Sequence, residues 1–200
     1  CNGNCWTMNN LRDLKYLFAY AIPASAILGL SMEGVWSWST PVLAFVILPV
    51  LELLLPQSKE NIPEPLESER SKQLFFDWLL YLNAPLLFGI VGGYLWVIAG
   101  QKLDFSETLG LTLSAGIVAG TCGINVAHEI GHRPGKAEHV LAQIMLLPTL
   151  YQHFFIEHNQ GHHKNVATDQ DPASARLGEN VFEFWVRSVT GGWRHAWTLE

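Results

Sequence analysis

The chain has 200 residues, of which 49% are hydrophobic and only 15% are charged, and its formal net charge is −6 at pH 7. Soluble domains carry about 25% charged residues, and the charges here cluster at 56–73 and from 128 onward, so the composition favours a membrane protein over a soluble domain with a large core. The negative charge argues against a nucleic-acid partner, and three cysteines, Cys1, Cys5 and Cys122, do not make the framework of a disulfide-rich secreted domain.

Four apolar runs predict four membrane-spanning helices. Each run is close to the ~20 helical residues that a ~30 Å hydrocarbon core requires. We expect residues 1–10 to form a tail and residues 56–73, which are polar and broken by prolines, to form a solvated loop. The runs lie at about 14–30, 35–55, 74–99 and 105–127.

The fold class predicted from this pattern is all-α, a polytopic transmembrane helix bundle over 11–127 followed by a metal-site region over 128–200. Small residues in the fourth run are typical of membrane helices that approach one another closely. These residues are Gly110, Ser114, Gly116, Gly120 and Gly123.

The distribution of Lys and Arg predicts how the chain is oriented in the membrane. On one side of the membrane, the segments next to the predicted spans carry a single basic residue, Lys102. The segments on the other side carry the rest of the basic residues near the spans. The excess of positive charge places the tail, the 56–73 loop and the segment after 127 in the cytoplasm. The basic residues on the cytoplasmic side are Arg12, Lys15, Lys59, Arg70, Lys72, Arg133 and Lys136.

The apolar stretch 140–156 is ambiguous. It contains 17 residues, two glutamines, one histidine and Pro148, so its hydropathy is that of a marginal span. Histidine clusters flank it on both sides, and a full crossing would separate them by a membrane. If the clusters share one metal site, this stretch is re-entrant or lies in the membrane interface.

Five of the eight histidines fall in two short boxes. The first is HEIGH, with His128 and His132 on one face of a helix that continues from the fourth apolar run. The second is EHNQGHH, with His158, His162 and His163; in an α-helix the last of these points about 100° away from its neighbour. Five imidazoles beside a bilayer indicate a metal site, because imidazolium charges repel and bare polar groups near hydrocarbon are costly.

HExxH alone is also the motif of zinc proteases, with Glu129 as the general base. A catalytic zinc site needs three protein ligands and an open position, and five candidate histidines exceed that number. Surplus nitrogen ligands favour a pair of irons. A membrane zinc protease and a metal transporter or sensor remain the rival interpretations; a transporter site is expected near the membrane midplane, whereas all eight histidines lie after residue 127.

Carboxylates lie next to the predicted ligands. Glu129 and Glu157 each adjoin a box histidine, and Asp171 follows the second box. Metal-bound imidazoles usually donate their second N–H to a carboxylate or carbonyl, so we expect these acids to support the ligand rings rather than bind metal. His139, His153 and His195 are interpreted as surface or hydrogen-bonded residues.

The segments NVAHEIGHRPGKAEH and HFFIEHNQGHHKNVATDQDPASARLGE resemble the first two histidine boxes of integral-membrane alkane 1-monooxygenases, relatives of the histidine-box fatty acid desaturases and hydroxylases. The resemblance extends over about 11–200 and includes the order and spacing of the boxes, the segment after the second box and the four preceding apolar runs.

The resemblance implies terminal hydroxylation of medium- to long-chain alkanes by O₂ at two non-haem iron ions, in the bacterial inner membrane with the site facing the cytoplasm. Rubredoxin, itself reduced by rubredoxin reductase, would deliver the electrons. Members of that family are about twice as long and carry a third histidine box, so this chain is expected to be the N-terminal half. No residue is assigned to the substrate channel. The ligands carried over are His128, His132, His158, His162 and His163.

Overall fold

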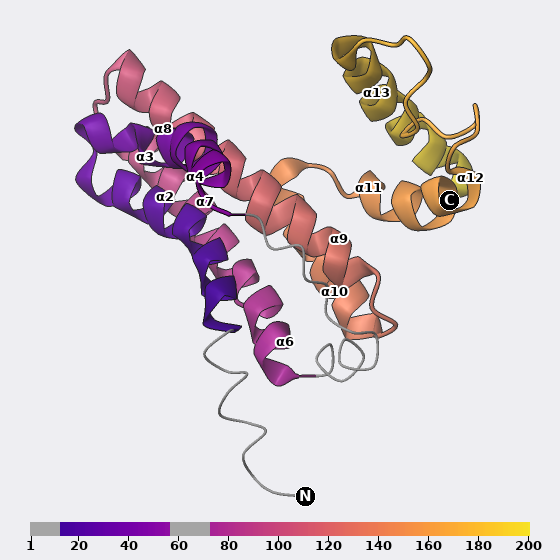
Figure 1. The fold of residues 1–200 in the computed structure, drawn as a ribbon, viewed down its shortest axis with the longest axis horizontal. Helices are drawn as coiled ribbons and strands as arrows, with labels where there is room; N and C mark the ends of the chain where they lie inside the picture. Colours follow the sequence, from indigo (N-terminus) through magenta and orange to yellow (C-terminus); the bar gives the residue numbers. More distant parts are fainter. Residues whose placement is uncertain (1–12, 57–72) are drawn as a thin grey trace, which may run out of the picture. The chain divides into compact units, whose positions relative to one another are not determined.

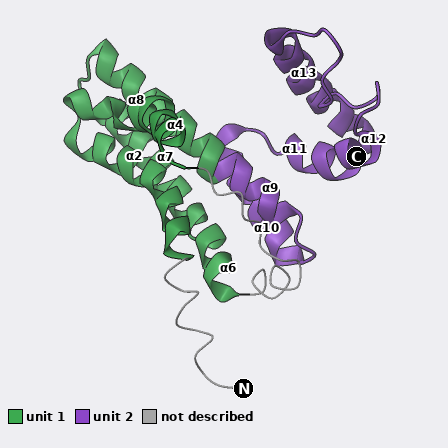
Figure 2. Cartoon of the chain, in the orientation of Figure 1, with its two compact units in different colours: residues 1–122 green, residues 123–200 purple. Residues whose placement is uncertain are grey.

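The computed structural model describes residues 13–56 and 73–200, so the predicted tail 1–10 and nearly all of the predicted loop 56–73 lie outside the described residues. The chain divides into two compact units, residues 1–122 and Gly123–Glu200 (Figure 2).

Four helices among the described residues are long and apolar enough to cross a membrane (Figure 1). This confirms the prediction of a polytopic helical fold with about four spans. The helices run over Leu14–Met32, Gly34–Leu54, Leu74–Gly100 and Phe105–Gly131.

The long helices are assembled from shorter α, 3-10 and π segments. The first consists of η1 (Leu14–Tyr20) and α2 (Ala21–Met32), and the third of α6 (Leu74–Tyr81) and α7 (Asn83–Gly100). The segments of the second are η2 (Gly34–Trp38), α3 (Ser39–Val42), η3 (Leu43–Ile47) and α4 (Leu48–Leu54). The segments of the fourth are α8 (Phe105–Val118), η4 (Ala119–Ile124) and α9 (Asn125–Gly131).

Small residues bring α8 close to η2 in the first unit. A Cβ atom added at Gly110 would lie 2.7 Å from the Oγ atom of Ser37 and 2.9 Å from its carbonyl oxygen. Ser114 donates a hydrogen bond of 3.1 Å to that same carbonyl. The predicted close approach is therefore found at Gly110 and Ser114, whereas a Cβ added at Gly116 would meet no heavy atom of the described residues within 4 Å.

The start of α8 is fixed by polar side chains. Asp104 caps the helix by accepting from the Glu107 N–H, and Glu107 accepts in return from the Asp104 N–H, which satisfies two backbone donors at once. Glu107 also accepts from the Gly34 N–H at 2.9 Å. Asp104 and Glu107 therefore stabilise the N-terminus of α8, and Glu107 also links it to the beginning of η2.

The second unit contains α9 followed by a series of short helices and one long one. These are α10 (Lys136–Met145), η5 (Leu147–Thr149), α11 (His153–Ile156), η6 (Glu157–His162), α12 (His163–Asn165) and α13 (Val181–Leu199).

The ambiguous stretch 140–156 is broken rather than continuous. Its helical part in α10 ends at Met145, the short η5 follows, and Leu150 adopts a left-handed conformation with φ of 54° before α11 begins. Ten helical residues extend for ~15 Å, which is half of a hydrocarbon core. No single segment of this stretch is long enough to cross a bilayer.

Gly131 allows the first histidine box to contact the segment before the second. A Cβ atom at Gly131 would lie 3.2 Å from the Cε2 atom of Phe155 and 3.9 Å from the Cβ atom of Ala142. The Phe155 ring also meets the His139 ring, edge to face, at 5.4 Å between centroids. The ring of Phe155 is therefore held between the end of α9 and the first turn of α10.

Candidate metal centre

Four histidine side chains of the second unit bring their Nε2 atoms together. The Nε2 atom of His158 lies 2.8 Å from that of His128, 3.2 Å from that of His132 and 3.0 Å from that of His163. The Nε2 atoms of His128 and His132 are 3.0 Å apart. His128, His132 and His158 form a group whose ligand atoms all lie within 4.8 Å of one another.

Hydrogen bonds alone do not account for this arrangement. Each neutral imidazole has one N–H donor and one acceptor nitrogen, so the single Nε2 atom of His158 is not satisfied by three close nitrogen partners at once. Two imidazole nitrogens that bind one metal at about 2.1 Å lie about 3.0 Å apart at a right angle and about 3.4 Å apart at the tetrahedral angle. The observed separations match the edges of a metal coordination shell.

The second box reaches the cluster because it lies in a π-helix, η6. In an α-helix, residues five positions apart point about 140° away from each other. The i to i+5 hydrogen bonding of a π-helix widens the turn to about 4.4 residues, which brings residues i+4 and i+5 to either side of residue i. His162 and His163 therefore both lie beside His158, at ring-centroid distances of 5.2 Å and 4.6 Å.

At neutral pH the ring of His158 is a neutral imidazole, the form that binds metal. Burial, together with the neighbouring rings of His128, His163 and His132, lowers the pKa of His158 to about 4. The ring of Phe154 stacks on His158 at 5.0 Å between centroids and provides part of this burial. Metal binding at neutral pH therefore displaces no proton from an imidazolium at His158.

His162 is oriented by an acid. Its Nδ1 atom lies 2.9 Å from Oδ2 of Asp171, a fully buried carboxylate. Burial alone would raise the pKa of Asp171, but hydrogen bonds from Ser174, the Ala173 N–H and His162 outweigh it and hold the pKa below its usual value. An ionised carboxylate at this position fixes the tautomer that leaves Nε2 of His162 free to bind a metal.

The other two acids expected near the ligands differ from Asp171. Glu157 is buried, and its Oε1 atom lies 3.2 Å from Nδ1 of His195 rather than against a box histidine. Glu129 is exposed. The Glu157–His195 contact joins η6 to α13, and a Cβ at Gly161 would lie within 2.8 Å of both side chains.

The pairing of His195 lies outside what the sequence predicts, since this histidine stands apart from both boxes. It is 38 positions from Glu157, and no local spacing connects the two. The available signal is the pattern of α13 itself, where two adjacent glycines, Gly191 and Gly192, precede His195 and mark a face that packs closely on another element.

A cavity of about 250 Å³ borders His158 of the cluster and the neighbouring His162. Its lining is mixed, with polar groups from Tyr151, Glu157 and Ser188 and apolar side chains from Phe154, Ala173 and Phe184.

The C-terminal part of the chain matches a known protein family. A sequence model of the fatty acid desaturase family matches residues 107–200, the part of the chain that carries both histidine boxes. The geometry and this match together describe a chain with four helices long and apolar enough to span a membrane and a histidine cluster able to hold a metal.

More closely, the chain is similar to alkane 1-monooxygenases. It is 36% identical over 183 residues to the alkane 1-monooxygenase of Pseudomonas putida and 34% identical over 183 residues to alkane 1-monooxygenase 1 of Alcanivorax borkumensis, in each case over 89% of this chain and 45% of the relative. The alkane 1-monooxygenase of Ectopseudomonas oleovorans is 33% identical over 193 residues, 93% of this chain and 48% of the relative. The chain spans about half the length of the curated relatives it matches. These similarities confirm the resemblance drawn from the histidine boxes.

Proposed function

We propose that the chain is part of an oxygen-dependent membrane monooxygenase that converts medium- to long-chain alkanes to 1-alkanols at two histidine-bound irons. The observation that carries the proposal is the set of four Nε2 atoms, from His128, His132, His158 and His163, with neighbouring separations of 2.8–3.2 Å. The similarity to alkane 1-monooxygenases supplies the reaction.

In this proposal the five box histidines hold the irons. Iron supplies the activation of O₂ that a terminal C–H bond requires, with one oxygen atom entering the product and the other leaving as water. Asp171 keeps Nε2 of His162 available by accepting from its Nδ1–H, and the π-turn of η6 presents His162 and His163 on the same side as His158. The Phe154 ring, stacked on His158, excludes water from one face of the site.

Electrons and membrane orientation belong to the same proposal. The proposed electron donor is rubredoxin, itself reduced by rubredoxin reductase. The chain is proposed to lie in the bacterial inner membrane with its metal site on the cytoplasmic side. With 140–156 divided into short helices, the two boxes lie on one side of the bilayer, with this stretch re-entrant or interfacial. A cysteine at Lys102 should react with a membrane-impermeant thiol reagent added to spheroplasts, and a cysteine at Lys136 should not.

A membrane zinc protease is the principal rival. Its three ligands would include His128 and His132, with Glu129 as the base. Two observations favour iron: the nitrogen separations lie nearer the ~3.0 Å of right-angled ligands than the ~3.4 Å of tetrahedral ones, and His163 joins the cluster beyond the three protein ligands that zinc needs.

A fatty acid desaturase or hydroxylase is the second candidate, favoured by the match of the desaturase family over residues 107–200. It would use the same histidines, so the metal does not distinguish the two reactions. The products do: a desaturase gives an unsaturated acyl chain, whereas the proposed enzyme gives a 1-alkanol from an alkane.

The test uses the full-length protein in detergent or nanodiscs, supplied with rubredoxin, its reductase, NADH and octane or hexadecane. We expect about two irons per chain and 1-alkanol formation, with both reduced strongly in His128→Ala and His162→Ala. His139→Gln is the matched control, because its amide retains a donor for the Arg133 carbonyl that Nε2 of His139 contacts at 2.7 Å.

Three results would contradict the proposal. One zinc per chain with peptide cleavage abolished by Glu129→Gln would establish the protease. Iron with acyl desaturation and no alkanol would establish the desaturase. Full iron content and hydroxylation in His128→Ala would remove that histidine from the site.

A further inference from the structure

Helix α13 carries six large apolar side chains on one exposed face, here called the tryptophan strip. At 100° per residue they lie within a sector of about 120°. Each is about half exposed or more, from 49% for Val189 to 70% for Phe182. The strip consists of Phe182, Trp185, Val186, Val189, Trp193 and Trp197.

The strip borders the face by which α13 packs in the second unit, and buried Ala196 lies where the two faces meet. Gly192 and Ala196 are buried, and His195 reaches Glu157 of η6 from that packed face. A third face is polar and includes Arg187, Arg194 and Thr198. The helix therefore has one face on protein, one suited to water and one that is apolar and, within the second unit, left open.

The composition of the strip indicates what covers it. Three of its six residues are tryptophans, and none is leucine or isoleucine. The indole N–H groups of Trp185, Trp193 and Trp197 make no hydrogen bond to any residue of 13–56 or 73–200, whereas the indole of Trp38 donates to Ser106 at 3.1 Å. A surface that fits these side chains accepts hydrogen bonds at its edge and is apolar beneath.

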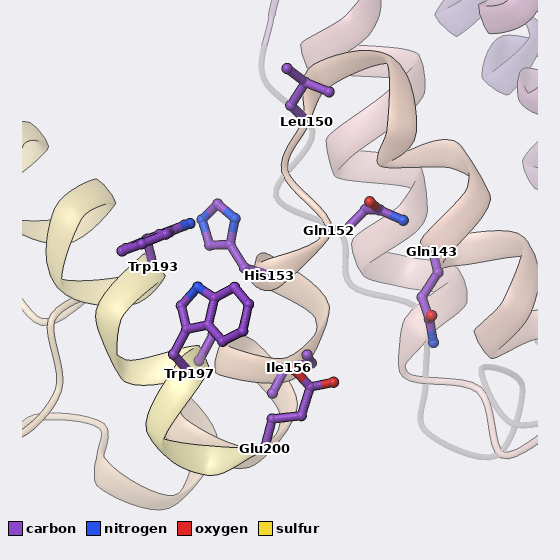
Figure 3. A pocket seen from close by; sticks show the side chains of 9 residues that line it. Gln143, Leu150, Gln152, His153, Ile156, Trp193, Trp197 and Glu200 are labelled. Carbon is purple, nitrogen blue, oxygen red and sulfur yellow. The ribbon is translucent and has the colours of Figure 1, made fainter.

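Two of the indoles also border an open pocket of about 390 Å³. Figure 3 shows Trp193 and Trp197 on α13 beside His153 of α11. The apolar part of the lining includes Ile156 and Leu150. The strip is thus continuous with a recess of mixed polarity.

We propose that the tryptophan strip of α13 lies in the membrane interface, with its aromatic rings among the lipid carbonyls and upper acyl chains. Four helices of the same chain are long and apolar enough to span a membrane, so a bilayer is at hand. Tryptophan is enriched at that depth because its ring is apolar and its N–H is polar. An amphipathic helix with Arg on its polar face and Trp and Phe on its apolar face is typical of interfacial helices.

The placement has a consequence for the metal centre. Because α13 packs on η6 through Gly192 and the His195–Glu157 contact, a lipid-bound α13 holds the second histidine box at the membrane surface. Alkanes dissolve in the hydrocarbon core, so this arrangement shortens the path from substrate to the cluster. This last step rests on the proposed function, whereas the lipid contact does not.

The test is nitroxide spin labelling of the full-length protein in nanodiscs of phosphatidylethanolamine and phosphatidylglycerol. Single cysteines replace Val186 and Val189 in the strip, and a third replaces Thr198, which lies about 180° from Val189 around the helix. The native cysteines are changed to serine. Power saturation then measures collisions of each label with O₂, which concentrates in lipid, and with a water-soluble nickel chelate.

We expect the ratio of O₂ to nickel collisions to be several-fold higher at Val186 and Val189 than at Thr198. Equal ratios at the three positions would place the strip in water and overturn the proposal. Protection of Val186 and Val189 from both reagents would show that protein covers the strip, either another segment of the chain or a second copy, and would also overturn it. Neither result depends on hydroxylation, so the proposed function is tested separately.

Discussion

The Nδ1 atom of His162 and the Oδ2 atom of Asp171 lie 2.9 Å apart, and the carboxylate is fully buried. Asp171 also accepts from the Ala173 N–H at 2.8 Å and from the Ser174 hydroxyl. The loop that follows the second histidine box is thus folded around one acid, which in turn sets the orientation of one predicted ligand.

Asp171→Asn should weaken metal binding without abolishing it. The amide keeps the shape of the side chain but accepts more weakly and no longer favours the required tautomer of His162. We expect the metal dissociation constant to rise by about 10–100-fold, measured by competition with a chelator. Ala173→Gly leaves the carboxylate in place and serves as the control; an unchanged constant in Asp171→Asn would show that the pair does not support a ligand.

Gly131→Val should separate the first histidine box from the helix before the second. Even a single Cβ would lie 3.2 Å from Phe155, so the larger side chain displaces that ring, and overpacking of this kind costs about 1–3 kcal/mol. We expect a lower melting temperature together with reduced iron content. Gly116→Val is the matched control, since its Cβ meets no described heavy atom within 4 Å; equal losses in both variants would show that the Phe155 contact is not responsible.

His195→Leu should destabilise the second unit by about 1–3 kcal/mol, because it leaves the buried Glu157 carboxylate without its donor. His195→Gln keeps a donor and should restore most of the stability. Chemical denaturation and iron analysis together give the test. We expect His195 to support η6 and not to bind metal. Loss of iron from folded His195→Gln protein would contradict this and would indicate that His195 is a ligand.

The Arg187–Glu179 pair should give the loop after Asp171 an acid-dependent stability. Two hydrogen bonds from Arg187 lower the pKa of Glu179 to about 2, from an ordinary value of 4.5. The stabilisation is complete above pH 4.5 and is lost as the pH falls toward 2. In metal-free protein, pepsin cleavage at 172–180 should increase over this range relative to Glu179→Gln, whose loop is already loosened at pH 5. Parallel pH profiles for the two proteins would contradict this prediction.

Hydropathy is sufficient to predict the spans, because a run of about 20 apolar residues with few charges is typical of a membrane-spanning helix. The sequence predicts the second span at 35–55, and the helix occupies Gly34–Leu54; the fourth continues beyond the predicted 127 to Gly131, so that it carries the HEIGH box directly. Because they are four residues apart in an α-helix, His128 and His132 lie on the same face, and their Nε2 atoms are 3.0 Å apart.

Other features depend on contacts that a sequence does not display. The approach of His163 to His158 requires a π-turn. If the second histidine box is instead assumed to be α-helical, His163 points about 100° away from His162. Adjacency in sequence predicts that Glu157 supports a neighbouring box histidine. It pairs instead with His195, since α13 folds back onto η6 and brings together residues 38 positions apart.

The widened turn of η6 holds one residue more than an α-helical turn would need to build the same box. Removing one residue between His158 and His162 would leave every histidine in the chain, and a sequence alignment would record only a single gap. In an α-helix the last two histidines would then follow His158 by three and four residues, and they would still lie on either side of it, about 60° one way and 40° the other. Relatives with the shorter spacing are therefore expected to reach the same arrangement of histidines with an ordinary α-helix in place of the π-turn.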